Sequence, residues 1–499
     1  MNNKKILNVY ILEQHAIGQR WIDIVNFIES NMKQQKEKFN FDIGHYYTVV
    51  SKLSKYLYVK HSLPKDKSEV KYIYENWTAG KITETELDYL KMWEVRSLKL
   101  GYNLYRFLNP DMQRGIKWGA RNEILWALYF HFNFFDEYFK SRSIDIVLGW
   151  VPENLVNYAC YIVAKYYGAT VKFLELSRIW PRIYFFDNIM YNKEGIKNEF
   201  MALQSRDLNV EEKSTANKLL TILLESDRPH YISVLLKEQK RQSIVKISYL
   251  KKMARRFHIP AEYFNQPYYP DETLYKLIFE RFKKIAHNIR VYFANNKATV
   301  TTTDNYFYFP LHFQPEISTS FMAPYFNDQL SVINNISLSL PVGTYLLVKD
   351  HPAMQDSRPI NYYKTIQNIS NVILVPSNTN SRYLIQNSLG VITISGTAGL
   401  EAMILGRPAI VMSKTWFADI PGLSLYVNNF EDLPKIMHSM ISFKTDNDLI
   451  EKFLFASSSY VINNLGLFQS SSVSSEEYKT NYSKIATVIL DEIAQCKFT

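Results

Sequence analysis

Short apolar and β-branched runs alternate with longer stretches of helical periodicity in two separate regions of this chain. Near the N-terminus, the run Lys5–Leu12 predicts a strand, and an amphipathic stretch that begins near Gln19 predicts a helix. The same alternation returns at 145–174, where strand, helix and strand follow one another with Gly168 as the helix C-cap. Alternation of this kind is typical of a parallel sheet covered by helices.

The strand–helix alternation resumes at Tyr306. Strands are predicted at 306–311, 345–348, 372–375, 390–394 and 409–412. Helices are predicted between them at 327–340, 381–388 and 399–405, and a final helix is predicted at 476–494. The pattern therefore predicts two α/β domains, of which the second is a doubly wound parallel sheet.

The residues between the two α/β regions contain few strand signals and many helical ones. Candidate helices there lie at 211–224, 232–257 and 272–294. We therefore divide the chain into an N-terminal Rossmann-like domain with helical insertions, a helical module, a C-terminal Rossmann-like domain and a C-terminal helix that is a candidate to return to the first domain. Their predicted bounds are 1–195, 196–296, 297–473 and 474–499.

Composition and charge narrow the possible partners. A hydrophobic fraction of 47% and a charged fraction of 21% are those of a folded protein. The 58 basic and 48 acidic residues give a net charge of +10, which favours an anionic partner. Most of the excess lies in the helical module, where Lys237–Arg256 predicts an amphipathic basic helix. This helix either packs on its own domain or docks on an anionic membrane surface, and no recognised motif for nucleic acid accompanies it.

The cysteines and the apolar segments indicate a compartment. Cys160 and Cys496 are too few for a disulfide framework or a metal cluster, so a reducing compartment is expected. The longest apolar stretch, Ile124–Phe135, is shorter than the roughly 20 residues that cross a membrane. We expect a cytoplasmic protein, with peripheral attachment to the inner face of the cell membrane as a further candidate.

One segment places small hydroxyl residues and glycines where a strand passes into a helix. In this turn Ser395, Gly396 and Thr397 offer hydroxyls and free backbone N–H groups to an anion such as a phosphate. Glu401 follows about one turn later, where a carboxylate can accept hydrogen bonds from ribose hydroxyls. The alternative is a capped helix that binds no ligand and in which Glu401 only favours the helix dipole.

Two further loops follow predicted strands of the same domain. Ligands of open α/β sheets bind at the carboxyl ends of the strands, so these loops are expected to reach the same edge. The candidate ligand-binding residues in them are Lys349, His351 and Pro352 in one loop and His312, Gln314 and Glu316 in the other. A surface histidine in a proline turn and a stiff domain linker are the alternative readings.

Taken together, these segments resemble the bacterial capsule polysaccharide biosynthesis proteins, which are glycosyltransferases of the GT-B type. The family pattern is a Lys-x-His-Pro loop, a Ser/Thr turn that leads into Gly-x-Glu-Ala, and a Gly-x-Pro before the next strand. Here it is met by Lys349–Pro352, Ser395–Ala402 and Gly406–Pro408. The resemblance covers about 309–423 and implies an α/β GT-B fold, with two facing Rossmann-like doubly wound domains and a helical insert.

The resemblance also implies an activity. It implies a nucleotide-sugar-dependent glycosyltransferase, in which domain 1–195 lies on the acceptor side and domain 297–473 binds a CMP- or UDP-linked sugar donor. The acceptor would be a surface or capsular polysaccharide or a lipid-linked glycan, and Kdo from a CMP donor is one candidate for an acidic sugar. A sugar-nucleotide epimerase or hydrolase of the same fold, or a non-catalytic glycan-binding subunit of a capsule assembly complex, remains an alternative.

The resemblance assigns roles to the donor-site residues. Lys349 and His351 would contact the donor phosphate or nucleoside, Ser395–Thr397 would cradle the phosphate, and Glu401 would orient the ribose. No metal and no cofactor beyond the nucleotide sugar is expected, because lysine, histidine and helix N–H groups can neutralise the leaving phosphate.

The catalytic group is expected on a loop after a strand of the first domain. Glu153, after the predicted strand 145–150, is the first candidate, Glu175 after the strand 170–174 is the second, and His15 is the third. A carboxylate there could deprotonate an acceptor hydroxyl or stabilise an oxocarbenium-like transition state. Each of the two glutamates is otherwise an exposed loop carboxylate.

Overall fold

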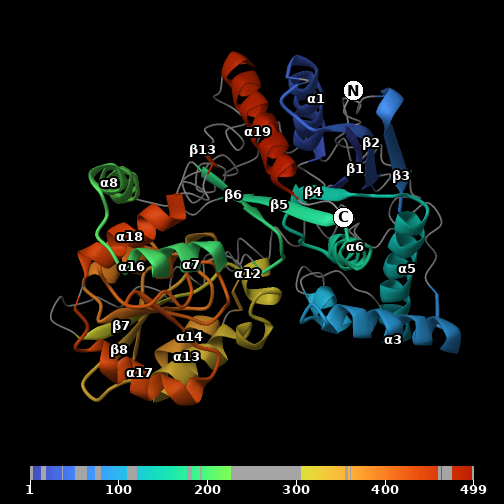
Figure 1. The fold of residues 1–499 in the computed structure, drawn as a ribbon. Coiled ribbons are helices and arrows are strands. Elements are labelled where there is room, and N and C mark those ends of the chain that lie inside the picture. Colours follow the sequence, from blue (N-terminus) through green and yellow to red (C-terminus); the bar gives the residue numbers. More distant parts are fainter. Residues whose placement is uncertain are drawn as a thin grey trace, which may run out of the picture. The chain divides into compact units, whose positions relative to one another are not determined.

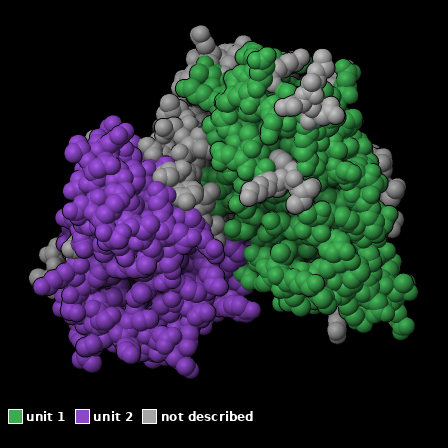
Figure 2. All heavy atoms as spheres, in the orientation of Figure 1, with its two compact units in different colours: residues 1–189, 260–270, 461–499 green, residues 190–259, 271–460 purple. Residues whose placement is uncertain are grey.

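The structure is a computed structural model in which the chain forms two compact units (Figure 2). Unit 1 contains 1–189, 260–270 and 461–499, and unit 2 contains 190–259 and 271–460. The residues that the structure describes are 4–12, 18–35, 37–50, 65–73, 80–109, 121–176, 182–190, 194–225, 305–354, 358–359, 361–444, 446–458, 462–463 and 475–496.

Unit 1 is built on a seven-stranded sheet with the order β13-β6-β5-β4-β1-β2-β3 (Figure 1). The strands from β5 to β3 are parallel, whereas β6 runs antiparallel to β5 and β13 antiparallel to β6. The strand order reverses between β1 and β4, because β2 follows on one side of β1 and β4 lies on the other. The bounds are β1 (Lys5–Leu12), β2 (Phe41–Val50), β3 (Ser68–Tyr72), β4 (Ile146–Trp150), β5 (Thr170–Leu176), β6 (Arg182–Phe186) and β13 (Ile462–Asn463).

Helices from both ends of the chain cover one face of this sheet. α19 packs against α1, and Trp21 and Ile28 of α1 share a core with Ile489 and Ile493 of α19. Lys172 in β5 adds an ion pair to Glu492 in α19 at 2.7 Å. The C-terminal helix is therefore an integral part of unit 1. The helix bounds are α1 (Gly18–Gln34), α3 (Glu84–Leu98), α5 (Arg121–Lys140), α6 (Leu155–Tyr166) and α19 (Ser475–Gln495).

Unit 2 contains a six-stranded parallel sheet with the order β12-β11-β10-β7-β8-β9. Numbered along the chain within this unit, the order is 6-5-4-1-2-3, which is that of the doubly wound dinucleotide-binding fold. The order reverses between β7 and β10. The bounds are β7 (Tyr306–Pro310), β8 (Tyr345–Lys349), β9 (Val372–Val375), β10 (Gly390–Thr393), β11 (Ala409–Val411) and β12 (Ser424–Tyr426).

The helices of unit 2 alternate with its strands. Their apolar faces join the sheet in one core that includes Ile333, Ile366, Ile392 and Met437. The bounds are α7 (Glu194–Leu203), α8 (Val210–Glu225), α12 (Ile317–Ser320), α13 (Gln329–Leu338), α14 (Tyr362–Gln367), α15 (Ser381–Gln386), α16 (Thr397–Ile404), α17 (Leu433–Met440) and α18 (Asn447–Ser458).

The first part of the predicted helical module is arranged differently in the structure. α7 and α8 do not form a separate module but belong to unit 2, where both pack on α18. Phe200 in α7 meets Phe453 in α18 edge-on at 6.2 Å, and Arg382 donates to the carbonyl of Leu223 at 2.7 Å. Apart from 194–225, the module, including Lys237–Arg256, lies outside the described residues.

The two sheets confirm the predicted α/β fold with two Rossmann-like units. Most strands in the middle of each sheet are buried on both faces, which explains why β4 and β10 are apolar without alternation. No helix in the part of the chain that the structure describes is both long and apolar enough to cross a membrane.

Candidate functional site

Two loops meet where the strand order of unit 2 reverses. The loop after β7 carries His312, and β10 passes through Ile394–Gly396 into α16. The backbone N–H of Ser395 donates to Nε2 of His312 at 3.2 Å, and Oγ1 of Thr393 lies 3.2 Å from the same nitrogen. The predicted phosphate turn and the predicted histidine loop are therefore in direct contact, at the point of the sheet where ligands of this fold bind.

His312 is held as a neutral ring with one unused donor. Because Nε2 accepts from a backbone N–H, the ring proton must lie on Nδ1. Burial, together with the smaller effects of the nearby His351 and Arg358, lowers the pKa of His312 to about 3. Nδ1 is buried and has no hydrogen-bond partner among the residues that the structure describes. His312 thus carries an uncharged N–H donor that the described residues leave unused.

The turn between β10 and α16 allows very close approach. A Cβ atom on Gly396 would stand 2.9 Å from Oγ1 of Thr393 and 3.0 Å from Nε2 of His312. Ser395 is anchored as well, because its hydroxyl donates to the carbonyl of Ser318 at 3.0 Å. The first turn of α16, with Gly396 as its N-cap, therefore begins at a fixed position, and a helix N-terminus is in general a favourable position for an anion.

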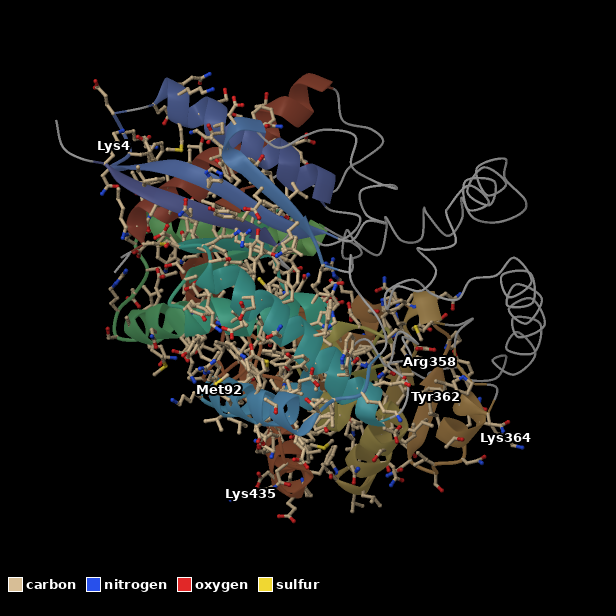
Figure 3. All side chains as sticks on the ribbon, turned by 90° about the vertical axis from the view of Figure 1, so that its right-hand side faces the viewer. Lys4, Met92, Arg358, Tyr362, Lys364 and Lys435 are labelled. Atoms are coloured by element: carbon tan, nitrogen blue, oxygen red, sulfur yellow. The ribbon has the colours of Figure 1, made fainter. Side chains whose placement is uncertain are left out.

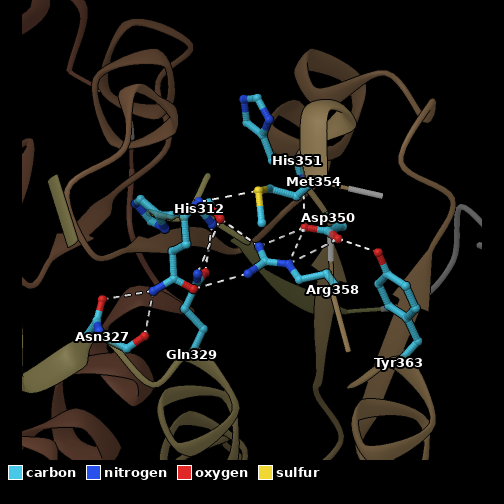
Figure 4. A network of polar contacts seen from close by, with 9 residues as sticks. His312, Asn327, Gln329, Asp350, His351, Met354, Arg358 and Tyr363 are labelled. Atoms are coloured by element: carbon cyan, nitrogen blue, oxygen red, sulfur yellow. Dashed lines mark hydrogen bonds and ion pairs between the residues drawn. The ribbon is translucent and has the colours of Figure 1, made fainter. Parts of the chain in front are cut away.

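A buried arginine that the sequence analysis did not select joins two of the loops (Figure 4). Arg358, 4% exposed, forms an ion pair with Asp350 at 3.0 Å and donates to the carbonyl of His312 at 2.6 Å. It also donates to Oε1 of Gln314 at 3.1 Å. Asp350 in turn accepts from the hydroxyl of Tyr363 at 2.6 Å. This network holds the loop after β7 against the loop after β8.

Arg358 also lies over an aromatic ring. Its guanidinium carbon is 5.0 Å from the centre of the Tyr362 ring, and Figure 3 labels the two residues side by side. A guanidinium that is stacked, paired and hydrogen-bonded in this way is typical of arginine rather than lysine. No local motif marks Arg358 in the sequence, because its partners come from three separate segments.

The three candidates on the loop after β7 differ in burial and in the groups that they contact. His312 is buried at the strand-order reversal, as described above. Gln314 is partly buried and structural, since its amide nitrogen donates to the carbonyl of Asn327 at 2.7 Å. Glu316 is exposed and precedes α12, where its carboxylate accepts from the hydroxyl of Ser318 at 2.5 Å.

The candidates at the end of β8 and in the loop after it also differ in what they contact, and Lys349 is the last residue of the strand rather than part of the loop. Nζ of Lys349 donates to the carbonyl of Thr379 at 2.9 Å and to the hydroxyl of Ser381, so it contacts the segment after β9. His351 is half-buried and meets Phe313 edge-on at 5.7 Å. Burial lowers its pKa to about 4, and the nearby Arg358 and Lys349 act in the same direction. Pro352 begins a 3₁₀ turn, η5 (Pro352–Met354).

Glu401 lies one turn into α16, as the sequence predicts. Burial raises the pKa of its carboxyl, whereas a hydrogen bond with Thr397 and the charges of Arg382 and Lys349 oppose that rise. The carboxyl is therefore largely withdrawn from water, and it lies close enough to Arg382 and Lys349 to be influenced by their charges.

The candidates of unit 1 occupy different kinds of position. Glu153 lies between β4 and α6, at the carboxyl end of β4 and hence where the strand order of that sheet reverses. Glu175 does not follow a strand, because β5 continues to Leu176 and Glu175 pairs with Tyr184 of β6. His15 lies outside the described residues. No group of three or more His, Cys, Asp or Glu within the described ranges could hold a metal ion.

The described residues form two Rossmann-like units. In unit 2, a glycine-containing turn leads from β10 into α16 at the point where the strand order reverses. Residues 221–432 match the model of a family described as capsule polysaccharide biosynthesis protein. This segment includes all the motif loops, so the match confirms the resemblance inferred from them. No curated protein matches the chain.

Solved structures resemble the chain only distantly. The beta Kdo 2,7 transferase KpsC of Thermosulfurimonas dismutans is 13% identical, with 74% of this chain and 90% of that chain covered and a TM-score of 0.35. The UDP-GlcNAc 2-epimerase of Neisseria meningitidis bound to UDP-GlcNAc is 14% identical, with 98% and 100% covered and a TM-score of 0.29. Likenesses this weak say nothing about the reaction of this chain.

Proposed function

We propose that this protein is a glycosyltransferase that moves a sugar from a nucleotide donor onto a surface or capsular polysaccharide. The observation that carries the proposal is the contact of His312 with the turn at Ser395 and Gly396, at the strand-order reversal of unit 2. The capsule family match of 221–432 supports the glycan as acceptor.

The donor phosphate would lie at the first turn of α16. Backbone N–H groups and the dipole of the helix stabilise negative charge there, and they do so most strongly as the nucleotide leaves with its phosphate. The Nδ1–H group of His312 would add a neutral donor to the same charge. These groups supply the stabilisation without a metal ion, so we propose a reaction that needs no metal and no cofactor.

The nucleoside would extend from the phosphate along α16. Glu401 would accept hydrogen bonds from the ribose hydroxyls, and His351 would contact the phosphate or the base. A CMP donor with an acidic sugar such as Kdo is our first choice, and a UDP-sugar is the second.

The acceptor would be activated by a carboxylate of unit 1. Glu153 is our first choice, because it follows β4 at the strand-order reversal and is not part of a strand ladder. Glu175 is the weaker candidate, because its backbone is paired between two strands. A glutamate base would take the proton of the acceptor hydroxyl as the new glycosidic bond forms.

A donor screen with the purified full-length chain tests the proposal. CMP, UDP, CMP-sugars and UDP-sugars are titrated by calorimetry, and nucleotide release is then followed with and without capsular glycan. We expect binding of at least one nucleotide, loss of that binding in His312→Ala and His351→Ala, and release that depends on the acceptor. The exposed His438 in α17 provides the control, and His438→Ala should bind like the wild type.

Other outcomes would replace the proposal. Turnover of a nucleotide sugar without acceptor would indicate an epimerase or hydrolase. Binding of glycan without binding of any nucleotide would indicate a non-catalytic subunit of a capsule assembly complex.

A further inference from the structure

Two buried hydroxyls follow the strand next to the phosphate turn. β11 ends at Val411, and Ser413 and Thr415 come immediately after it. Their side chains are 1% and 7% exposed, and neither hydroxyl has a hydrogen-bond partner anywhere in the described part of the chain. A buried hydroxyl without a partner has given up its hydrogen bonds to water and gained none in return, so such groups call for an explanation.

The loop that carries these hydroxyls is bonded to the phosphate turn. The backbone N–H of Met412 donates to the carbonyls of Thr393 and Ile394 at 3.0 and 3.1 Å. Farther along the loop, a ring atom of Phe417 lies 3.3 Å from the point where a Cβ on Gly399 would stand. The loop therefore contacts both the strand that leads into the turn and the first turns of α16.

The loop is also rigid. The backbone N–H of Thr415 donates to the carbonyl of Ser413 at 2.8 Å, which forms a tight turn between the two hydroxyl residues. Trp416 stacks on Phe453 of α18 with the ring centres 5.9 Å apart and the planes 9° apart. The backbone thus cannot easily turn the hydroxyls toward new protein partners. Lys414, between them, is exposed and adds a positive charge to the loop.

We propose that the hydroxyls of Ser413 and Thr415 bind the phosphoryl oxygens of the ligand held at the turn 395–397. This inference rests on the proposed function, since it takes a nucleotide sugar as that ligand. β10 and β11 are neighbouring strands, and such strands are about 4.8 Å apart. A phosphoryl group over the carboxyl ends of both strands can therefore accept hydrogen bonds from both loops, and it satisfies hydroxyls that have no partner among the described residues.

The test compares Ser413→Ala and Thr415→Val with the wild-type full-length chain. Affinities for CMP, UDP and inorganic pyrophosphate are measured by calorimetry, and melting temperatures are measured without ligand. We expect each variant to bind about tenfold more weakly, the loss typical of one hydrogen bond to a charged group. Because neither variant removes a hydrogen bond among the described residues, we expect the melting temperature to stay the same or rise.

Ser388 provides the matched control. It is also a buried serine of unit 2, but its hydroxyl donates to the carbonyl of Ile385 at 2.8 Å, and it precedes β10 at the opposite edge of the sheet. Ser388→Ala should lower the melting temperature and leave every affinity unchanged.

The possible results separate this inference from the proposed function. If the wild type binds a nucleotide and both variants bind it equally well, the inference is overturned and the donor site stands. If the wild type binds pyrophosphate but no nucleotide, the proposed function is overturned, and weaker pyrophosphate binding in the variants still supports the inference. Absence of binding to all three probes overturns both.

Discussion

The imidazole Nε2 of His312 accepts a hydrogen bond from the backbone N–H of Ser395, a residue 83 positions farther along the chain. This bond fixes which ring nitrogen carries the proton, and it joins the loops after β7 and β10. Because these strands lie on the two sides of the strand-order reversal, the bond also defines the position of the candidate site within the sheet.

Gly396→Ala should weaken nucleotide binding. The new Cβ would stand within 3.0 Å of both Thr393 Oγ1 and His312 Nε2, so the turn must move away from the histidine. We expect at least a tenfold loss of affinity by calorimetry and a loss of about 1–3 kcal/mol in the free energy of unfolding, which is the usual cost of overpacking.

Gly390→Ala is the control for this change, because Gly390 lies at the other end of β10. A Cβ there would meet Met440 Cε at 2.3 Å, so this variant should also lose stability. It should keep the wild-type affinity. If both variants lost the same nucleotide affinity, the loss in Gly396→Ala would come from general instability of unit 2. It would then not come from movement of the turn 395–397.

Arg358→Met should destabilise unit 2 strongly. It leaves the buried carboxylate of Asp350 without its cation, and the loss of one partner of a buried pair costs about 3–5 kcal/mol. Chemical denaturation of Arg358→Met, Asp350→Asn and the double variant forms a double-mutant cycle. We expect the double variant to lose clearly less than the sum of the single variants.

Arg358→Lys separates the charge of the arginine from its geometry. It keeps a cation near Asp350 but cannot reach all of the groups to which Arg358 donates, including the carbonyl of His312. We expect stability between those of the wild type and Arg358→Met, together with weaker nucleotide binding. Wild-type affinity in this variant would contradict a positioning role.

The site was partly visible in the sequence because some of its chemistry is local. Glycine and hydroxyl residues after an apolar run indicate the turn 395–397. Runs of β-branched residues indicate the strands around it. Arg358 could not be found in this way, because its importance comes from the burial of its charge among segments that only the fold brings together. The unused hydroxyls of Ser413 and Thr415 are likewise invisible until their lack of partners is known.

Two structural errors have the same origin. The sequence predicts a loop at Glu175 because the apolar run ends at Leu174, whereas β5 continues to Leu176 through its pairing with β6. The periodicity predicts the helix α8 correctly, but it does not indicate which other helix α8 packs against. That partner, α18, lies more than two hundred residues farther along the chain.

Acid should destabilise unit 1 through His131. This histidine in α5 is fully buried, its Nδ1 lies 2.7 Å from the carbonyl of Ala127, and burial lowers its pKa to about 4. The unfolded chain, with an ordinary pKa near 6.5, binds the proton more readily, so stability is present above pH 6.5 and is lost as the pH falls toward 4.

Chemical denaturation at pH 7 and pH 4.5 measures this contribution. In His131→Gln, which cannot titrate, the loss of stability between the two pH values should be smaller than in the wild type by about 2 kcal/mol. His45→Gln, at an exposed position of β2, should show the full wild-type loss. An undiminished loss in His131→Gln would place the acid sensitivity elsewhere.

Glu401→Gln should remove the preference of the protein for ribose over deoxyribose. In the proposed donor site the carboxylate would accept hydrogen bonds from sugar hydroxyls, and each such bond to a charged group is worth about 1.5–3 kcal/mol. The wild type should therefore bind CMP at least tenfold more tightly than 2′-deoxy-CMP, or UDP more tightly than dUDP. The variant should bind both members of the pair with nearly equal affinity, because an amide keeps the shape but not the charge.

Since burial raises the pKa of Glu401, the preference of the wild type for ribose should also weaken as the pH falls and the carboxylate takes up a proton. Equal discrimination by wild type and variant would show that the ribose is oriented by another residue.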